Sequence, residues 1–402
     1  MTVKHAIVMV GLPARGKTFV ARKIFRFLTW LGHDAKLFNA GDYRRVMLGA
    51  QHSHEFFSPD NAEGKRARLA VAQAALEDLF TWLRQGGQTA IYDATNTTHA
   101  RRELIVQRCA HEGVTPLFVE ILVNDEAVIE RTIRETKVRS ADYIDMDPDA
   151  AVADFRARIA HYASAYEPLG SNDGSYIKYI DIGRELAVQN ADSELGQVLV
   201  RLLLNLRGAR KRLWLTRHGE SVYNGLGLIG GDPDLSPKGL SFAKRLARFV
   251  EKHGGAQQEL VVWTSSLRRT IQTAAELRML ALATRELDEI NAGVCDGKSY
   301  PQIEHELPDE FAARKHDKFR YRYPRGESYQ DVIKRLLPVV LAFEHEVRPI
   351  LVVGHQAVLR TFYSYLTNQP PEQCPHLSIP LHTVIELTPK LYDWEERRFL
   401  LD

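Results

Sequence analysis

The first half of the chain alternates short strand-like runs with longer stretches that have one apolar face. The strand-like runs cover residues 6–10, 35–38, 89–92 and 117–123. The first of them is wholly apolar, as is typical of a strand buried on both faces of a parallel sheet. Residues 19–31 then place apolar side chains on one helical face, and Gly32 marks the end of that helix. This alternation predicts an α/β fold with a mostly parallel sheet and helices on both faces.

Three further strand-like runs in the second half each end in polar residues. They cover residues 213–220, 261–266 and 350–356. In an α/β sheet, ligands bind at the carboxyl ends of the strands. The second half therefore predicts another α/β unit with a ligand site at one edge of its sheet.

A basic stretch separates the two halves. Residues 194–206 have a helical pattern, and residues 207–212 then read Arg-Gly-Ala-Arg-Lys-Arg before the next apolar run. A glycine-containing charged stretch of this kind is a plausible domain boundary. A length of 402 residues also exceeds what one ordinary core accommodates. We therefore predict two domains, residues 1–208 and residues 209–402.

The composition narrows the class of protein. Hydrophobic residues make up 45% and charged residues 26%, as in soluble globular proteins. The net charge of +2 argues against a nucleic-acid partner. The three cysteines, Cys109, Cys295 and Cys374, are widely spaced and odd in number, which excludes a disulfide scaffold and fits a reducing cytosol. There is no signal segment and no window of ~18 uninterrupted apolar residues, so we expect a cytoplasmic protein with no membrane partner.

The first apolar run leads directly into a complete P-loop motif. The motif consists of Gly11, Leu12, Pro13, Ala14, Arg15, Gly16, Lys17 and Thr18. Its glycines let backbone N–H groups curl around phosphates at a helix N-terminus. Lys17 reaches the outer phosphates, and the hydroxyl of Thr18 coordinates Mg²⁺. Because a strand precedes the motif and a helix follows it, we predict a nucleotide-phosphate site that uses Mg²⁺.

Asp93 ends the third strand-like run and lies at the same edge of the predicted sheet. Its carboxylate is placed to coordinate Mg²⁺ or to accept the proton of an attacking hydroxyl. The alternative is an N-cap for a helix that begins near Arg101. Other basic residues of this half are by default solvated surface side chains, and these are Arg44, Arg45, Arg68, Arg101 and Lys137.

Three strings of the first half resemble the kinase half of the bifunctional 6-phosphofructo-2-kinase/fructose-2,6-bisphosphatase family. They are residues 11–18, 57–61 (Phe-Ser-Pro-Asp-Asn) and 93–98 (Asp-Ala-Thr-Asn-Thr-Thr), and the resemblance runs from about residue 5 to about residue 205. It implies a P-loop NTPase-like domain with ATP in the P-loop and beside Thr132. It places Asp93 and Thr95 at the reacting centre, with Lys137 facing the nucleotide phosphates. The residues implied for fructose 6-phosphate are Arg44, Arg68, Arg101, Arg158 and Tyr162.

Two histidines and two arginines converge on one predicted sheet edge in the second half. A histidine backed by arginines suits phosphoryl chemistry, because the imidazole can take the phosphoryl group while guanidinium groups hold its oxygens. A lone strand-end histidine is as readily a core or capping residue. The convergence of four such residues favours a phosphoryl site, and the four are Arg217, His218, Arg269 and His355. Glu289 stands before a glycine-containing turn, and by itself it is equally well a solvated carboxylate.

The second half resembles the histidine phosphatase (phosphoglycerate mutase-like) superfamily and, more closely, the bisphosphatase half of the same bifunctional family. The strings that carry this are residues 229–232, 263–265, 289–295, 321–324 and 354–360, within about 212–390. The resemblance implies that His218 attacks the 2-phosphate of fructose 2,6-bisphosphate and forms a phosphohistidine without a metal. Arg217, Arg269 and His355 would hold the phosphoryl oxygens, while Glu289 protonates the leaving oxygen and then activates water. The residues implied for the sugar and the 6-phosphate are Asn224, Gly230, Tyr300, Arg314, Lys318, Tyr329, Gln356 and Arg360.

Three positions depart from the family pattern. Relatives often carry cysteine at Val123, asparagine at Thr132 and arginine at Leu228. These departures leave open a protein in which one activity dominates or is lost. A further alternative is a P-loop kinase of another small acceptor, fused to a mutase-like phosphatase. A P-loop binds the nucleotide but does not determine which molecule receives the phosphoryl group. The family resemblance implies a homodimer, and the short flanks lead us to expect little control by terminal phosphorylation.

Overall fold

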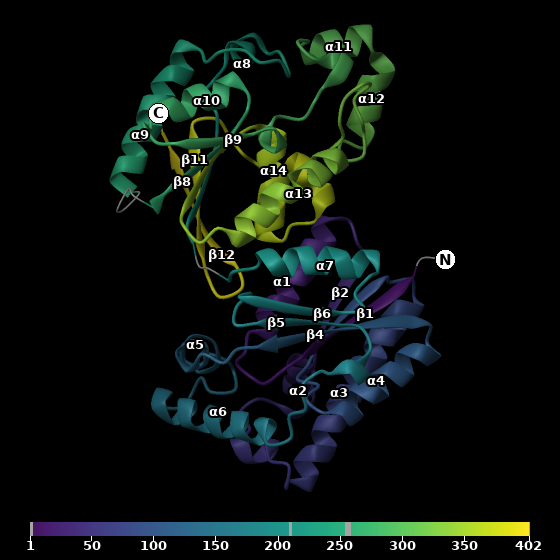
Figure 1. Cartoon of the computed structure of the whole chain (residues 1–402). Helices are drawn as coiled ribbons and strands as arrows, with labels where there is room; N and C mark the ends of the chain where they lie inside the picture. Colours follow the sequence, from purple (N-terminus) through teal and green to yellow (C-terminus); the bar gives the residue numbers. More distant parts are fainter. Residues whose placement is uncertain (1–2, 209–210, 254–258, 402) are drawn as a thin grey trace. The chain divides into compact units, whose positions relative to one another are not determined.

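A computed structural model describes residues 3–208, 211–253 and 259–401. The chain divides into two compact units, Met1–Leu206 and Arg207–Asp402. Within the described residues, each unit contains a six-stranded sheet (Figure 1). Part of the basic stretch on which the boundary prediction rests, residues 209–210, lies outside the described residues. The boundary between residues 208 and 209 therefore stays a prediction.

The sheet of the first unit has the strand order β2-β3-β1-β4-β5-β6. Its strands are β1 (Lys4–Val10), β2 (Ala35–Asn39), β3 (Thr89–Asp93), β4 (Val114–Leu122), β5 (Tyr176–Ile180) and β6 (Glu185–Gln189). Every neighbouring pair is parallel except β5 and β6, which are antiparallel. The mostly parallel sheet that the pattern predicts is therefore confirmed. The pattern did not reveal β5 and β6, since buried and partly exposed residues alternate along β5 and only Ile177 and Tyr179 are buried there.

Helices cover both faces of this sheet, as predicted. The α-helices are α1 (Lys17–Trp30), α2 (Ala40–Leu48), α3 (Ala62–Arg84), α4 (His99–His111), α5 (Glu126–Thr132), α6 (Pro148–Ala163) and α7 (Glu194–Asn205). Single helical turns are η1 (His54–Phe57), η2 (Ile133–Lys137) and η3 (Ser171–Asp173). Helices α1 and α7 lie on one face, and α3 and α4 lie on the other (Figure 1).

The sheet of the second unit has the strand order β12-β11-β7-β10-β8-β9. Its strands are β7 (Leu213–Arg217), β8 (Val261–Ser265), β9 (Ala281–Thr284), β10 (Ile350–Gly354), β11 (Thr383–Pro389) and β12 (Trp394–Leu400). Strands β7, β10, β8 and β9 are parallel, whereas β11 runs antiparallel to both β7 and β12. The three predicted runs form three adjacent strands at the centre of the sheet. Their carboxyl ends, and the residues that follow them, therefore meet at one edge.

Helices also flank the second sheet. They are α8 (Val222–Leu226), α9 (Pro237–His253), α10 (Arg268–Ala275), α11 (Tyr300–Glu306), α12 (Pro308–His316), α13 (Tyr329–His345) and α14 (Gln356–Thr367). Short 3₁₀ helices are η5 (Arg285–Leu287), η6 (Gly293–Cys295) and η7 (Pro371–His376). Helices α9 and α10 pack together on one face, and α13 and α14 pack together on the other (Figure 1). Arg269 lies in the first turn of α10, as the sequence predicts.

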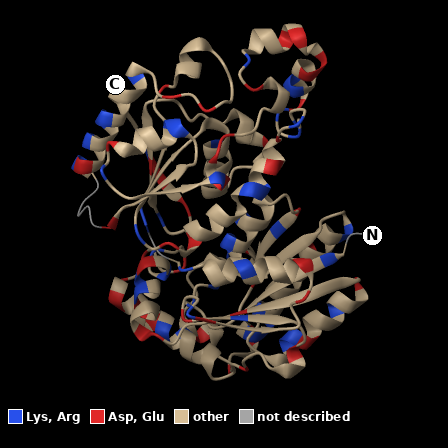
Figure 2. Cartoon of the chain, turned by 45° about the horizontal axis from the view of Figure 1, so that its top comes forward, with Lys and Arg blue, Asp and Glu red and all other residues tan. Residues whose placement is uncertain are grey.

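The surface carries both signs of charge. Figure 2 shows Lys and Arg interspersed with Asp and Glu along the helices of both units. Within the described residues, no helix is long and apolar enough to cross a membrane. In the same part of the chain, no three His, Cys, Asp or Glu side chains group together to hold a metal ion. All three cysteines are free and buried.

Candidate active sites

The P-loop connects the end of β1 to the start of α1. Gly11 has a φ of 133°, and a Cβ atom there would lie 2.6 Å from the carbonyl oxygen of Ile121. Only glycine avoids that clash and adopts that φ without strain. Gly16 is the N-cap of α1 with a φ of 87°, and no side chain caps the helix. The first N–H groups of α1 are therefore available to a phosphate, as the motif predicts.

Lys17 and Asp93 are two buried opposite charges beside the loop. Lys17 Nζ donates to the carbonyl oxygen of Leu12 at 2.7 Å. Burial lowers the pKa of Lys17 to about 7, although the negative charge of Asp93 opposes the shift. Burial raises the pKa of Asp93, and hydrogen bonds from Thr18 and Asn39 oppose that shift. Each charge thus depends on the other group, or on a ligand, for compensation.

Asp93 does not cap a helix. Helix α4 begins at His99, and its N-cap is Thr98, whose hydroxyl accepts the N–H of Arg101. The N-cap alternative for Asp93 is therefore wrong. Its carboxylate lies instead at the end of β3 and accepts a hydrogen bond from the hydroxyl of Thr18. A hydroxyl and a carboxylate side by side fit Mg²⁺, which prefers oxygen ligands.

Arg44 is buried rather than solvated. Its Nη2 lies 2.7 and 2.6 Å from the two carboxylate oxygens of Asp142, and its side chain is only 6% exposed. The guanidinium groups of Arg45 and Arg158 lie 3.7 Å from the same carboxylate. Sequence reasoning missed Asp142, because an isolated aspartate in a loop carries no signal of its three partners. One buried carboxylate thus gathers three arginines.

Other residues implied for fructose 6-phosphate lie around the same cluster. The guanidinium of Arg158 lies 3.5 Å from the ring centre of Phe57, whose ring lies 6.2 Å from that of Tyr162. Burial lowers the pKa of Arg68, and the positive charges of Arg158 and Arg101 lower it further. Arg101 donates from Nε to Asn96 at 3.1 Å.

Lys137 joins this positive cluster. Burial lowers its pKa, and Arg158 lowers it further, while Asp93 acts in the opposite direction. The surface default for Lys137 is therefore wrong. Arg44 Nη1 and Arg158 Nε are buried without a hydrogen-bond partner among the described residues. Buried cationic N–H groups in excess of their acceptors suit an anionic ligand.

Thr95 and Thr132 were also predicted in this site, but each takes part in a hydrogen bond that involves backbone groups and does not indicate a ligand. The carbonyl oxygen of Thr95 accepts the N–H of Gly11 at 2.9 Å, which ties the end of β3 to the P-loop. The hydroxyl of Thr132 donates to the backbone of its own helix, at the carbonyl of Val128, 2.8 Å away. Their side-chain roles stay predictions. Val123, one of the departures from the family, is buried in an apolar cluster with Ala14 of the loop.

The second site is centred on His218 at the end of β7. Its Nδ1 lies 2.6 Å from the carbonyl oxygen of Gly219. Because a carbonyl only accepts, Nδ1 carries the proton and Nε2 has the lone pair. Arg269 Nε donates to that Nε2 at 3.2 Å, and its Nη1 donates to the carbonyl of Gly231 at 2.7 Å. Burial, reinforced by the charge of Arg269, holds the pKa of His218 well below 6.5, so the ring is neutral.

The other predicted residues of the phosphoryl site surround His218. The ring of His355 lies 5.1 Å from that of His218, and burial holds its pKa well below 6.5. Burial lowers the pKa of Arg217 to about 10, while Glu289 opposes the shift. The carboxylate of Glu289 accepts the N–H of Ala357 at 3.1 and 3.3 Å, so it is anchored at the start of α14 rather than freely solvated.

A second basic group lies on the helical segments beyond this centre. Arg314 donates to the hydroxyl of Tyr300 at 2.9 Å. Burial lowers the pKa of Lys318 to about 8, with Arg314 and Arg360 lowering it further. Arg360 also hydrogen-bonds the hydroxyl of Tyr329, whose pKa burial raises to about 12. These five residues, all implied for the sugar and the 6-phosphate, are thus interconnected.

Three more residues were predicted to bind the sugar or the 6-phosphate, and these are Gly230, Asn224 and Gln356. Gly230 has a φ of 71°, which favours glycine, and a Cβ atom there would lie 1.5 Å from a carboxylate oxygen of Asp296. Asn224 pairs with Ser221 in a capping box at the start of α8. Gln356 is the first residue of α14. Contact with substrate stays a prediction for all three.

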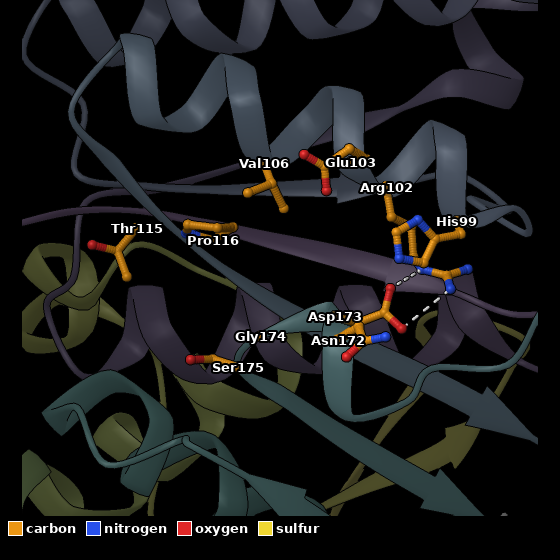
Figure 3. Close-up of a pocket in the computed structure, with 10 residues that line it drawn as sticks. All are labelled: His99, Arg102, Glu103, Val106, Thr115, Pro116, Asn172, Asp173, Gly174 and Ser175. Atoms are coloured by element: carbon orange, nitrogen blue, oxygen red, sulfur yellow. Dashed lines mark hydrogen bonds and ion pairs between the residues drawn. The ribbon is translucent and has the colours of Figure 1, made fainter.

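A separate cavity of about 270 Å³ lies between α4, the start of β4 and η3 (Figure 3). Its wall includes the buried ion pair between Arg102 and Asp173, with Nε and Oδ1 2.6 Å apart. None of the residues implied for catalysis or binding lines it.

Comparison with known proteins assigns both halves. Residues 1–210 match the family described as 6-phosphofructo-2-kinase, and residues 213–401 match the histidine phosphatase superfamily (branch 1). A 6-phosphofructo-2-kinase/fructose-2,6-bisphosphatase from Arabidopsis thaliana is 46% identical over 98% of this chain, and the match covers 54% of that protein. Isoform 4 of the enzyme of that name from Homo sapiens is 44% identical over 96% of this chain and 82% of its own length. A fructose-2,6-bisphosphatase from Saccharomyces cerevisiae is 42% identical over 97% of this chain and 87% of its own length.

Proposed function

The chain belongs to the 6-phosphofructo-2-kinase/fructose-2,6-bisphosphatase family, and we propose that it performs both reactions named there. It makes fructose 2,6-bisphosphate from ATP and fructose 6-phosphate in the first unit. It hydrolyses that product to fructose 6-phosphate and phosphate in the second. The observation that carries the proposal is the placement of a P-loop and a neutral His218–Arg269 pair at the carboxyl edges of two separate sheets.

The kinase half positions two anionic substrates. Residues 11–18 bind the phosphates of ATP, with Lys17 supplying positive charge to the outer ones. The residues that bind fructose 6-phosphate and orient its 2-hydroxyl are Arg44, Arg68, Arg101, Arg158 and Tyr162. Asp93 accepts the proton of that hydroxyl. Bound Mg²⁺ would neutralise charge on the ATP phosphates, and Thr18 and Asp93 are the residues that would hold it.

The phosphatase half uses a covalent intermediate. The Nε2 lone pair of His218 attacks the 2-phosphorus, and the bond from phosphorus to the sugar oxygen breaks. Glu289 donates a proton to the leaving oxygen and then takes one from the water that hydrolyses the phosphohistidine. Arg217, Arg269 and His355 hold the phosphoryl oxygens, where negative charge accumulates in the transition state.

A protein with predominant phosphatase activity is the second candidate. The yeast relative matches nearly all of this chain, yet its name states only the phosphatase. Thr132 supports this candidate too, because relatives often carry asparagine at that position in the kinase half. The ratio of the two rates decides between the candidates.

The experiment supplies Mg²⁺ with labelled ATP and fructose 6-phosphate, and follows formation and decay of fructose 2,6-bisphosphate. Lys17→Ala should abolish synthesis and leave hydrolysis unchanged, whereas His218→Ala should do the reverse. Circular dichroism is the folding control for both variants, and the activity of the unaffected half shows that each preparation contains active protein. Synthesis that survives Lys17→Ala would contradict the nucleotide site, and hydrolysis that survives His218→Ala would contradict the nucleophile.

The proposal includes a cytoplasmic homodimer that takes small-molecule substrates. The cysteine usage supports the compartment, and the family resemblance alone supports the dimer. Sedimentation equilibrium of the full chain tests the dimer, and a monomer mass at micromolar concentration would contradict it.

A further inference from the structure

A chain of buried hydroxyl groups ends on His355. We propose that Ser265 and Thr270 are positioning residues that determine which ring nitrogen of His355 carries the proton, so that Nδ1 donates to a phosphoryl oxygen of the substrate. The inference rests on the proposed phosphatase function and deepens it by adding two residues that do not touch the substrate.

The contacts form one continuous line. Ser265 Oγ, at the end of β8, lies 2.7 Å from His355 Nε2 and 2.7 Å from Thr270 Oγ1 on α10. Ser265 Oγ also accepts the N–H of Leu267 at 3.1 Å. Ser265, Thr270 and His355 are each 0% exposed. Water therefore does not compete for these hydrogen bonds, and their direction is decided by the protein and its ligand.

The hydrogen bonds that join His355, Ser265 and Thr270 can form with two different arrangements of the protons. His355 is neutral, since burial holds its pKa well below 6.5, and a neutral imidazole has one N–H. In the first arrangement, Nε2–H donates to Ser265, Ser265 donates to Thr270, and Thr270 donates to the carbonyl of Leu267 at 2.8 Å. In the second, Thr270 donates to Ser265 and Ser265 donates to Nε2. The N–H of His355 is then on Nδ1.

A bound phosphoryl group selects the second arrangement. Nδ1 of His355 is buried and has no hydrogen-bond partner among the described residues. Phosphoryl oxygens only accept, so they stabilise Nδ1–H and repel a lone pair there. Ser265 then uses every hydrogen-bonding position, because it accepts from Leu267 and Thr270 and donates to His355. The carbonyl of Leu267 still accepts the backbone N–H of Thr270 at 3.1 Å.

The two histidines would then present different nitrogens to one phosphoryl group. The carbonyl of Gly219 holds the proton of His218 on Nδ1, so Nε2 is unprotonated and attacks phosphorus. The hydroxyl line fixes His355 with Nδ1–H, which donates to oxygen. A nucleophile and a hydrogen-bond donor therefore arise from the same side-chain type through different partners.

The kinetics of matched variants test the positioning role proposed for Ser265 and Thr270. Removal of a hydrogen bond that orients a donor to a charged group costs roughly ten- to a hundredfold. We expect Ser265→Ala to lower kcat for hydrolysis of fructose 2,6-bisphosphate by that factor with little change in KM, and Thr270→Val to lower it less. Ser266→Ala is the control, because the neighbouring hydroxyl is exposed and binds Asp288 instead. Circular dichroism and thermal unfolding of the same preparations report that each variant is folded.

The tautomer itself is read by ¹⁵N NMR of histidine-labelled protein with saturating inorganic phosphate, and His355→Gln assigns the signal. We expect Nδ1–H in the wild type and a mixture or the opposite tautomer in Ser265→Ala. Nε2–H in the phosphate-bound wild type would overturn the inference, and so would unchanged kcat and spectra in both variants. A wild type that does not hydrolyse fructose 2,6-bisphosphate would overturn the proposed function instead, while the phosphate titration would still decide the tautomer.

Discussion

Acidification should leave the first step of the phosphatase reaction intact. His218 must be neutral to attack phosphorus, and burial together with the adjacent guanidinium of Arg269 holds its pKa well below 6.5. Arg269 Nε lies 3.2 Å from the attacking nitrogen, so a proton there would meet a cation at contact distance. The pKa is lowered, so the reactive form persists through pH 6.5 and is lost only when the pH falls through the lower value.

The size of the effect follows from the ordinary imidazole pKa. A histidine with a pKa of 6.5 would be about 90% protonated at pH 5.5, and the rate of phosphoryl transfer would fall roughly tenfold between pH 7.5 and 5.5. The buried His218 should show no such fall. The unfolded chain does bind protons below pH 6.5, so His218 and His355 each lower the free energy of unfolding by up to ~1.4 kcal/mol per pH unit as the pH falls below 6.5.

Rapid-quench measurement of labelled phosphohistidine separates these effects. Fructose 2,6-bisphosphate labelled in the 2-phosphate is mixed with excess enzyme at pH 5.5 to 7.5, and the phosphoenzyme is trapped in alkali. A ³¹P titration of the free substrate corrects for its own ionisation, and circular dichroism reports folding. A loss of phosphoryl transfer with a midpoint near pH 6.5, in protein that remains folded, would refute the reasoning.

Three further predictions concern the kinase half and the cysteines. Gly11→Ala should abolish synthesis of fructose 2,6-bisphosphate while hydrolysis continues, because its Cβ would lie 2.6 Å from a β4 carbonyl; measurable synthesis in a coupled assay would contradict this. Asp142→Ala should lower the free energy of unfolding in urea by ~3–5 kcal/mol, because it leaves the buried Arg44 unpaired. Asp145→Ala, on an exposed carboxylate nearby, is the control, and equal losses in both variants would refute the explanation. Native protein at pH 8 should not react with a thiol reagent, since all three cysteines are buried and burial raises the pKa of Cys109 to about 12; rapid labelling before denaturation would contradict it.

Much of the fold and of both candidate sites could be predicted from local sequence. The P-loop is contiguous, so one stretch of chain specifies the strand, the turn and the helix that carry Lys17. The position of strand-end residues such as His218 is also predictable. The carboxyl ends of parallel strands meet at one edge of the sheet, and this does not depend on the conformation of the loops. Strands β5 and β6 escaped prediction, because only Ile177 and Tyr179 of β5 and no residue of β6 are buried, so neither strand has the continuous apolar signal of the central strands.

Only the tertiary structure decided which charges are buried and what pairs with them. Arg44 and Lys137 were given surface defaults, but Arg44 is buried and Lys137 is partly buried. Folding brings Asp142 to Arg44 across 98 positions of sequence. Glu289 has an ordinary sequence environment, and its anchoring by the backbone of α14 depends on a contact 68 residues away. Sequence therefore determined the elements and the reactive side chains they carry, since these follow from local backbone preferences. Burial and partnership, which set protonation and orientation, arise only when distant elements pack and exclude water.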